Sequence, residues 1–264
     1  MDLALNGKTV LVTGSTAGIG LAIAQRLAHE GAHVIVNGRT QARVDSALAI
    51  LGQTVASVTN RGVAADLGTA EGCAQLLRAV PQADILVNNL GIFEARPFEQ
   101  IADGDWLRLF ETNVMSGVRL SRHYFPQMLA RNWGRIVFIS SESALNIPAE
   151  MIHYGMTKTA QLAVARGLAE LTAGTTVTVN SVLAGPTRSE GVGTFVAQMA
   201  KAKGVDAAAV EREFFATVRP SSLLKRFEEP EEIAALVAFV VSPLASAVNG
   251  ASLRVDGGVV RSIP

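Results

Sequence analysis

The chain has 264 residues, of which 49% are hydrophobic, and its 23 basic and 23 acidic side chains give a formal net charge of zero. A chain of this length and composition is able to bury one sizeable core. Its balanced charge does not predict the basic surface that binds nucleic acid or anionic lipid. We therefore expect no nucleic acid and no membrane as partner, and instead a small neutral or amphipathic molecule.

Cysteine usage and the N-terminal residues carry little functional signal. The single cysteine, Cys73, has no second cysteine to pair with and no cluster of metal ligands around it in the sequence, so we expect neither a disulfide nor a metal site. The N-terminal residues show no basic stretch followed by an apolar one, and no apolar run approaches the ~18 residues of a membrane-spanning helix. The expected location is the cytoplasm.

Short runs rich in Val and Ile alternate along the chain with longer amphipathic segments. This alternation is typical of repeated strand-helix units that form a parallel sheet, and Gly31, Gly52, Gly134 and Gly174 mark expected helix ends. We expect a single α/β domain over residues 1–264, with a doubly wound, Rossmann-like parallel sheet of seven strands. The strands are predicted near Thr9–Val12, His33–Asn37, Gly62–Ala65, Ile85–Val87, Arg135–Ile139, Thr176–Ser181 and Ser252–Val255.

One connection is too long for an ordinary loop. More than forty residues separate the strand ending near Ser181 from the helix expected near Glu229. Helical spacing over Gly193–Ala202 and Asp206–Val218 predicts a small helical flap on the substrate side, residues 189–218, over the carboxyl ends of the strands. An oligomer contact or plain surface packing is the alternative. The expected apolar anchors are Phe195, Met199, Phe214 and Phe215.

A glycine-rich turn follows the first predicted strand, in the stretch Thr13-Gly14-Ser15-Thr16-Ala17-Gly18-Ile19-Gly20. A helical pattern begins directly after it. Glycines allow the backbone to approach a pyrophosphate, which then lies at the N-terminus of the helix. The alternative is that the glycines serve only a tight turn. The expected cofactor contacts here are Gly14, Ser15, Thr16, Gly18, Ile19 and Gly20.

The end of the second predicted strand bears on the choice between NAD(H) and NADP(H). An acidic residue there would bind the ribose hydroxyls and disfavour a 2′-phosphate, but Asn37-Gly38-Arg39-Thr40 offers a neutral rim and a guanidinium. This favours NADP(H) over NAD(H), with Arg39 on the phosphate. Alternatively, Arg39 is a solvated arginine at a helix start, and Ala17 supplies no second cation in the turn.

Two further strand ends carry candidate cofactor contacts. Asp66 and Leu67 follow the third strand, where a carboxylate can accept from the adenine amino group, but Asp66 is equally suited to cap the next helix. Asn89 and Gly91 follow the fourth strand. We expect all four residues to bind the cofactor.

The pair Tyr154 and Lys158 gives the sharpest chemical signal. Residues four apart share one face of a helix, so the phenol and the ammonium can serve one site. A nearby ammonium and a positively charged nicotinamide ring favour the phenolate, which allows the phenol to act as general acid or base closer to neutral pH. On spacing alone, a surface cation-aromatic pair is the alternative.

Two polar residues are expected to assist Tyr154. Ser141 follows the strand 135–139, at the strand ends where ligands bind in such sheets, and its hydroxyl can hold a substrate oxygen. Asn113, on the preceding long helix, can seat a water that links Lys158 to solvent. The alternatives are a simple cap for Ser141 and a helix-bending polar residue for Asn113.

In combination, these motifs resemble the short-chain dehydrogenase/reductase family over nearly the whole chain. The resemblance implies an Asn113–Ser141–Tyr154–Lys158 catalytic tetrad, with Tyr154 and Lys158 also contacting the cofactor, and a homotetramer or homodimer. It further implies that Thr187 and Ser189 bind the cofactor. Leu90 and Ala184 depart from the family pattern, which has Ala and Pro there. The residues that carry the resemblance are Thr13–Gly20, Asp66, Asn88–Gly91, Asn113, Ser141, Tyr154, Lys158, Asn180–Gly185 and Val255–Gly258.

The expected activity is hydride transfer between NADP(H) or NAD(H) and a small ketone or secondary alcohol. A catalytically silent dinucleotide-sensing protein of the same fold and a structural oligomer are the alternatives. Polarity from Glu142, Glu150 and His153 either recognises a hydroxyl or an amine or forms a solvated rim. The candidates for substrate contact are Phe93, Glu142, Leu145, Ile147, Glu150, Met151, His153 and residues 189–218.

Overall fold

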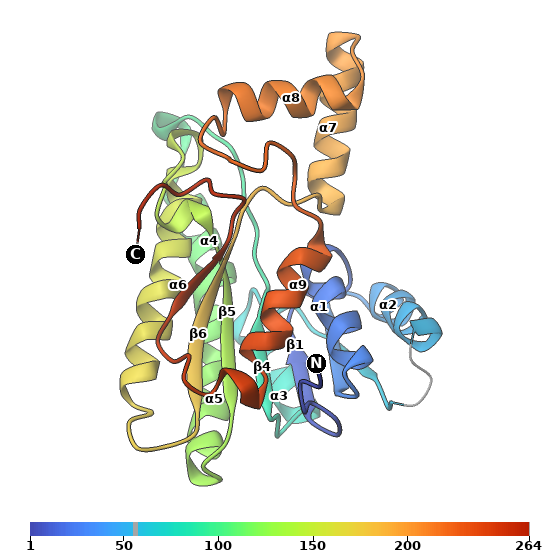
Figure 1. Cartoon of the computed structure of the whole chain (residues 1–264), viewed down its shortest axis with the longest axis vertical. Coiled ribbons are helices and arrows are strands. Elements are labelled where there is room, and N and C mark those ends of the chain that lie inside the picture. The colour runs from blue at the N-terminus through green and yellow to red at the C-terminus, as the bar shows by residue number, and fades with distance from the viewer. Residues whose placement is uncertain (55–57, 264) are drawn as a thin grey trace.

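The computed structural model describes residues 1–54 and 58–263. In this part of the chain, seven parallel strands form one sheet in the order β3-β2-β1-β4-β5-β6-β7, which confirms the predicted doubly wound α/β fold (Figure 1). The central strands β5 and β6 are buried along their whole length, as expected for strands covered on both faces. The strands are β1 (Thr9–Val12), β2 (His33–Gly38), β3 (Arg61–Ala64), β4 (Ile85–Asn88), β5 (Arg135–Ser141), β6 (Thr178–Ala184) and β7 (Ser252–Val255).

Helices cover both faces of this sheet and enclose two apolar cores. Side chains of α1, α2 and α9 join one core, and side chains of α3, α5 and α6 join the other. The helices are α1 (Gly18–His29), α2 (Gln41–Thr54), α3 (Ala70–Ala79), α4 (Asp103–Phe110), α5 (Ser116–Ala130), α6 (Ile152–Glu170), α7 (Glu190–Lys203), α8 (Ala207–Thr217) and α9 (Pro230–Val240). Short 3-10 helices span Phe98–Gln100, Glu142–Ala144, Ala149–Met151 and Pro243–Ala245, and a π-helix spans Glu111–Met115.

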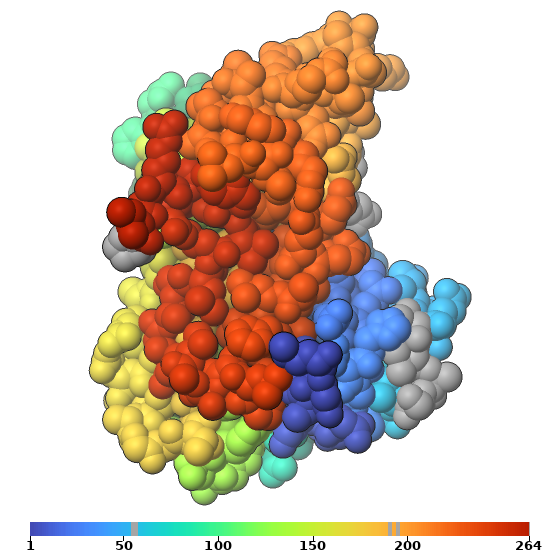
Figure 2. All heavy atoms as spheres, in the orientation of Figure 1, coloured from blue at the N-terminus to red at the C-terminus, as the bar shows by residue number. Residues whose placement is uncertain are grey.

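The helices α7 and α8 form a unit that projects beyond the sheet at the carboxyl ends of its strands (Figures 1 and 2). They confirm the two predicted helices of segment 189–218, with slightly different ends. Val196, Val210, Phe215 and Phe227 form a small apolar cluster, against which Met199 and Phe214 pack. Three of the predicted anchors therefore lie where expected, and the side chain of Phe195 lies outside the described residues.

Several predicted boundaries were wrong. Strand β6 begins at Thr178 and continues to Ala184, because its pairing with β5 extends to the last residue of that strand, Ser141. Helix α2 continues past Gly52, since an exposed glycine costs a helix only about 1 kcal/mol. Helix α5 ends at Ala130, where Asn132 adopts a φ of 54° and makes the turn that Gly134 was expected to mark.

No helix among residues 1–54 and 58–263 has the length and apolar character needed to cross a bilayer.

Candidate active site

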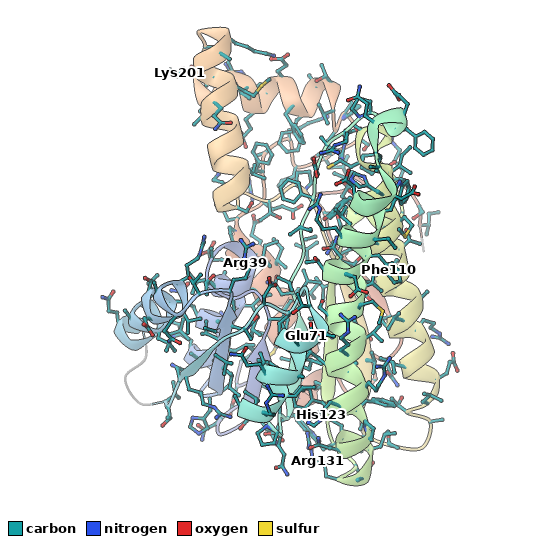
Figure 3. The ribbon with its side chains drawn as sticks, turned by 180° about the vertical axis from the view of Figure 1, so that it is seen from behind. Arg39, Glu71, Phe110, His123, Arg131 and Lys201 are labelled. Atoms are coloured by element: carbon teal, nitrogen blue, oxygen red, sulfur yellow. The ribbon has the colours of Figure 1, made fainter. Side chains whose placement is uncertain are left out.

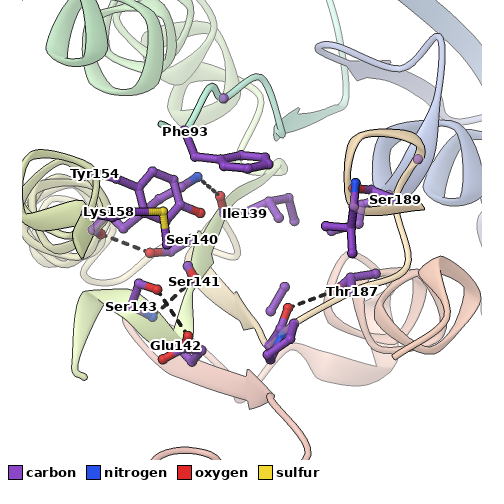
Figure 4. Close-up of a pocket in the computed structure, with 18 of the residues that line it drawn as sticks. Phe93, Ile139, Ser140, Ser141, Glu142, Ser143, Tyr154, Lys158, Thr187 and Ser189 are labelled. Carbon is purple, nitrogen blue, oxygen red and sulfur yellow. Dashed lines mark hydrogen bonds between the residues drawn. The ribbon is translucent and has the colours of Figure 1, made fainter. Parts of the chain in front are cut away.

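A cavity of about 1010 Å³ lies between the strand ends and the helices α7 and α8. Figure 4 shows Tyr154 and Lys158 on one side of it and Thr187 and Ser189 on the opposite side. The glycine-rich turn closes one end, and residues around the carboxyl end of α8 close the other. The lining includes Gly14, Ala17, Gly18, Ile19, Gly20, Asn89, Leu90, Gly91, Phe93, Ser141, Glu142, Glu150, Met151, Tyr154, Lys158, Thr187, Ser189, Phe214, Val218 and Arg219.

The glycine-rich turn requires glycine at several positions. Gly14 and Gly18 have φ values of 59° and 53°, in the left-handed region. A Cβ on Gly20 would lie 2.4 Å from Asn89 Nδ2 and 2.5 Å from the Gly14 carbonyl oxygen. No side chain caps α1 at Ala17, so the first N–H groups of this helix point from its start without a side-chain acceptor. The turn has the shape of an anion cradle.

Polar side chains hold this turn in place. Asn89 Nδ2 donates to the carbonyl oxygens of Thr13 and Gly14 at 2.9 and 3.0 Å. The Ser15 hydroxyl donates to the Val12 carbonyl at 2.7 Å and accepts from the Asn37 N–H. The Ser15 N–H donates to the Asn37 carbonyl, so the polar groups of Ser15 are engaged within the protein.

Asn37 is a structural residue rather than part of a rim, which corrects our expectation. Its side chain is buried, and Nδ2 donates to the carbonyl oxygens of Val63 and Ala65 at 3.1 and 3.2 Å. Its Oδ1 accepts from the Gly14 N–H. The amide thus joins the turn to the strand β3.

The residues expected at the adenosine end lie outside the lining of the cavity. Arg39 is exposed between β2 and α2 (Figure 3). At the preceding residue, Gly38, a Cβ would lie 2.5 Å from Thr16 Cγ2 of the glycine-rich turn. Asp66 is exposed, and its Oδ1 accepts from the Gly68 N–H at 3.0 Å. Helix α3 is capped instead by the hydroxyl of Thr69, so the capping hypothesis for Asp66 was wrong. Leu67 is buried in the core.

Tyr154 and Lys158 lie one turn apart on α6, in the wall of the cavity. The Lys158 Nζ lies 5.7 Å from the centroid of the Tyr154 ring and donates to the Ile139 carbonyl at 2.9 Å. Lys158 is buried, which excludes the alternative of a surface pair. Burial lowers the pKa of Lys158 to about 8.

The pKa of Tyr154 differs from our expectation. We expected the ammonium of Lys158 and a nicotinamide ring together to favour the phenolate. In the protein alone, burial raises the pKa of Tyr154 to about 12, and the neighbouring Ser141 hydroxyl opposes that rise only in part. The ammonium lies against the ring face rather than at the phenolic oxygen. The phenol is therefore protonated at neutral pH, which is the state of a proton donor.

Ser141 and Asn113 are placed differently with respect to the cavity. Ser141 is the last residue of β5 and lines the cavity, and its Oγ accepts from the Ser143 N–H at 3.1 Å. Asn113 lies in the π-helix between α4 and α5, and its side chain pairs with both backbone groups of Ile92 and with the Thr157 hydroxyl. It thereby ties the loop after β4 to α6.

A family model described as short chain dehydrogenase matches residues 8–200. The chain belongs to the short-chain dehydrogenase family.

Relatives of this chain are similar over its whole length. It is 50% identical to "Uncharacterized oxidoreductase YvaG" of Bacillus subtilis over 263 residues, which is 100% of both chains. It is 35% identical to D-beta-hydroxybutyrate dehydrogenase of Cupriavidus necator over 260 residues, 97% of this chain and 99% of the other. L-sorbose reductase from Gluconobacter frateurii, solved in complex with NADPH and L-sorbose, matches with a TM-score of 0.94 and 31% identity over 100% of both chains.

In this short-chain dehydrogenase, Gln161 links Lys158 to Asn113, a role that sequence reasoning missed. Its Oε1 accepts from Lys158 Nζ at 3.3 Å, and its Nε2 donates to the Asn113 carbonyl at 2.6 Å. Gln161 lies three residues after Lys158 on the same helix face, so the spacing was a signal that could have found it.

The segment after β6 forms the wall opposite Tyr154. The Thr187 hydroxyl donates to the Gly185 carbonyl at 2.9 Å, and Ser189 is the N-cap of α7. Glu228, also missed from sequence, accepts from the Gly185 N–H at 3.2 Å. Burial above all, with a smaller contribution from the nearby charge of Asp256, raises the pKa of Glu228 to about 8, against the opposing effect of the Gly185 hydrogen bond.

The polar residues expected near the substrate do not form one solvated rim. Glu142 and His153 are buried, whereas the Glu150 side chain is 46% exposed. His153 packs against the Trp106 ring and does not line the cavity. Leu145 and Ile147 also lie outside the lining of the cavity, whereas Phe93 and Met151 belong to it.

Proposed function

We propose that this protein transfers hydride between NADP(H) and the carbonyl carbon of a small ketone, or the corresponding secondary alcohol. The observation that carries the proposal is the convergence of Ser141, Tyr154 and Lys158 on one cavity that begins at the glycine-rich turn. Helices α7 and α8 cover the substrate side of this cavity. The family relationship supports dinucleotide-dependent oxidoreduction.

The residues of the cavity fit a dinucleotide. The glycine-rich turn brings free helix N–H groups to the position of a pyrophosphate. A Cβ on Gly91 would lie 3.3 Å from Lys158 Nζ, so the glycine leaves room for a ligand group to approach this ammonium. Thr187 and Ser189 would contact the nicotinamide end. When bound, the nicotinamide supplies the hydride in reduction and accepts it in oxidation.

The chain's own residues then provide proton transfer and orientation. The Ser141 hydroxyl would hold the substrate oxygen in line with the Tyr154 phenol. In reduction, Tyr154 donates its proton to that oxygen, and in oxidation it takes the proton back. Lys158 places a positive charge beside the ring and stabilises the phenolate that remains after donation. Gln161 accepts a hydrogen bond from Lys158 and is itself held by the Asn113 carbonyl, so these two residues position the ammonium.

Arg39 supports the preference for NADP(H). Its guanidinium is exposed at the end of β2, next to a glycine, and residues 37–40 include no acidic side chain. We expect Arg39→Ala to raise the KM for NADPH about tenfold, because the pairing with a 2′-phosphate is lost, and to leave the KM for NADH within about twofold. An equal effect on both cofactors would mean that Arg39 contacts no 2′-phosphate.

The direct test of the proposal compares the wild type with Tyr154→Phe in NADPH oxidation over a panel of ketones. Removal of the phenolic proton donor should lower kcat by about 10²–10⁴-fold. The Kd for NADPH, measured by fluorescence titration, should stay within about twofold. Equal background rates in both proteins would contradict the proposal and favour a dinucleotide-sensing protein without chemistry.

A further inference from the structure

A buried charged pair forms part of the cavity wall directly beside the proposed catalytic residues. Glu142 follows Ser141 in the chain, and Arg219 comes from the segment after α8, 77 residues away. The Arg219 Nε donates to Glu142 Oε1 at 2.8 Å, and the two side chains are only 8% and 3% exposed. Both residues line the same cavity as Tyr154.

This pair leaves one polar atom unsatisfied. Glu142 Oε1 accepts from Arg219 and from the Ser143 hydroxyl, but Oε2 is buried and has no hydrogen-bond partner among the described residues. Leaving a buried oxygen without a hydrogen-bond partner is unfavourable, and more so when the oxygen is charged. The terminal torsion of a glutamate is soft, so the carboxylate can turn toward a ligand group in the cavity. Such a group would satisfy the oxygen.

The position of the carboxylate places that ligand group near the reacting carbonyl. Glu142 is adjacent in sequence to Ser141, and its charge raises the pKa of the Tyr154 phenol while the charge of Arg219 lowers it. Figure 4 shows Glu142 and Ser143 below Ser141 on the same side of the cavity as Tyr154. A group that contacts Glu142 would therefore lie on the same side of the cavity as the proposed proton donor.

The chemistry of the pair selects a hydroxyl. A hydroxyl both donates and accepts, so it can pair with a carboxylate and with a guanidinium. An alkyl chain would leave Oε2 unsatisfied. A charged substrate group would be attracted by one member of the pair and repelled by the other, whereas a neutral hydroxyl can pair with both.

We propose that the Glu142–Arg219 pair binds a hydroxyl group of the substrate, and that the substrate is a polyhydroxylated ketone or the polyol formed from it. The inference rests on the proposed function and names its substrate class. Beside apolar wall residues such as Phe93 and Met151, the cavity is also lined by Glu150, whose Oε1 lies 3.6 Å from Arg219 Nη1, so the polar anchor extends to a second acceptor.

Three ketones with the same four-carbon skeleton test the proposal. Erythrulose, as both enantiomers, carries hydroxyl groups next to the carbonyl, 2-butanone carries none, and acetoacetate carries a carboxylate. With the wild type and NADPH, we expect kcat/KM for one enantiomer of erythrulose to exceed that for the other two ketones at least tenfold. The reaction in each case is reduction of the carbonyl with one NADPH and one proton.

The double variant E142M/R219M identifies the residues responsible. Replacement of both charges by apolar side chains of similar size avoids an unpaired buried charge and so protects the fold. The ratio of kcat/KM for erythrulose to that for 2-butanone should fall at least tenfold. Any change in the acidity of Tyr154 affects both ketones and cancels in this ratio. Glu99→Gln, an exposed acid outside the cavity lining, is the matched control and should leave the ratio unchanged.

Three outcomes would overturn the inference. If the wild type reduces 2-butanone or acetoacetate with the same kcat/KM as erythrulose, the proposed function stands but the pair binds no substrate hydroxyl. If the double variant melts like the wild type and keeps the ratio of kcat/KM for erythrulose to that for 2-butanone, the pair has no role in substrate recognition. A wild type that binds NADPH and reduces no ketone contradicts the proposed function, and the inference falls with it.

Discussion

The two ends of the cavity are built in different ways. At the glycine-rich turn, the buried side chains of Ser15 and Asn37 and the half-buried side chain of Asn89 hydrogen-bond the turn to the neighbouring strand ends. At the other end, α7 and α8 pack on a small apolar cluster that Phe227, in the chain after α8, completes. Ion pairs of Arg188 with Glu211 and of Arg219 with Glu142 attach this unit to the body. The glycine-rich turn is thus tied to the strands of the sheet, whereas α7 and α8 pack as a separate unit.

Because the two ends are packed separately, a substitution in the glycine-rich turn should leave α7 and α8 largely intact, and the reverse should also hold. A turn that shares its hydrogen bonds with the central strands can change shape only together with the sheet. A unit with its own cluster can open locally at a lower cost in free energy. We therefore expect changes in α7 and α8 to affect the ketone, and changes in the turn to affect the cofactor.

The largest expected contrast is between two buried phenylalanines. Phe138 on β5 belongs to the main core, so Phe138→Ala should lower the free energy of unfolding by about 3–5 kcal/mol. Phe215 on α8 belongs to the small cluster, so Phe215→Ala should lower the free energy of global unfolding by less than Phe138→Ala does. It should also raise the KM for the ketone more than the KM for NADPH. Urea unfolding and steady-state kinetics measure both effects. An equal loss of global stability in the two variants would show that α7 and α8 unfold only with the sheet.

A second contrast uses the same substitution at both ends. Gly20→Ala should raise the Kd for NADPH about tenfold or more and destabilise the protein by about 1–3 kcal/mol, because the new Cβ would lie 2.4 Å from Asn89 Nδ2. Gly193→Ala in α7 is the matched control, since no atom lies within 4 Å of its Cβ position. That variant should stabilise the protein by about 0.4–1 kcal/mol. Cofactor titration and thermal melting measure the pair, and similar Kd values for the two variants would refute the steric argument.

The smallest contrast is one of pH and concerns Glu228, which supports the wall after β6. Its folded pKa of about 8 lies above the ordinary value of 4.5, so the folded state binds the extra proton between these values and stability falls as pH rises from about 4.5 to about 8. Glu228→Gln removes this titration. The variant should therefore gain about 1–3 kcal/mol over the wild type at pH 8, and less at pH 5.

Thermal melting of both proteins across this pH range measures the gain from Glu228→Gln. The exposed Glu231, at the start of α9, provides the control Glu231→Gln, whose difference from the wild type should not grow with pH in the same way. A gain from Glu228→Gln that is the same at pH 5 and pH 8 would show that Glu228 is ionised in the folded protein.

Much of the fold was predictable because its signals are local. Runs of Val and Ile located the strands, and the glycines of the turn and the four-residue spacing of Tyr154 and Lys158 depend on backbone geometry within one element. The exact ends of β6 were not predictable, because the pairing with β5 sets them. Gly52 likewise failed as a helix end because its exposed position tolerates glycine inside α2.

The residues that sequence reasoning missed act across long distances in the chain. Arg219 meets Glu142 over 77 residues, and Glu228 meets the Gly185 N–H over 43. No periodicity or motif brings such pairs together, since the packing of α8 and the chain that follows it determines the contact. The acidity of Tyr154 was misjudged for a related reason, because burial depends on the completed cavity.

The central claim, hydride transfer to a ketone, is tested most directly by isotope transfer. The protein is incubated with NADPH that carries two deuterium atoms at C4 of the nicotinamide and with the ketone that it reduces fastest. The alcohol product is then analysed by mass spectrometry. Our account predicts one deuterium on the new carbinol carbon, and a strongly reduced yield with Tyr154→Phe. An unlabelled alcohol, or no alcohol from any ketone while the protein binds NADPH, would contradict it.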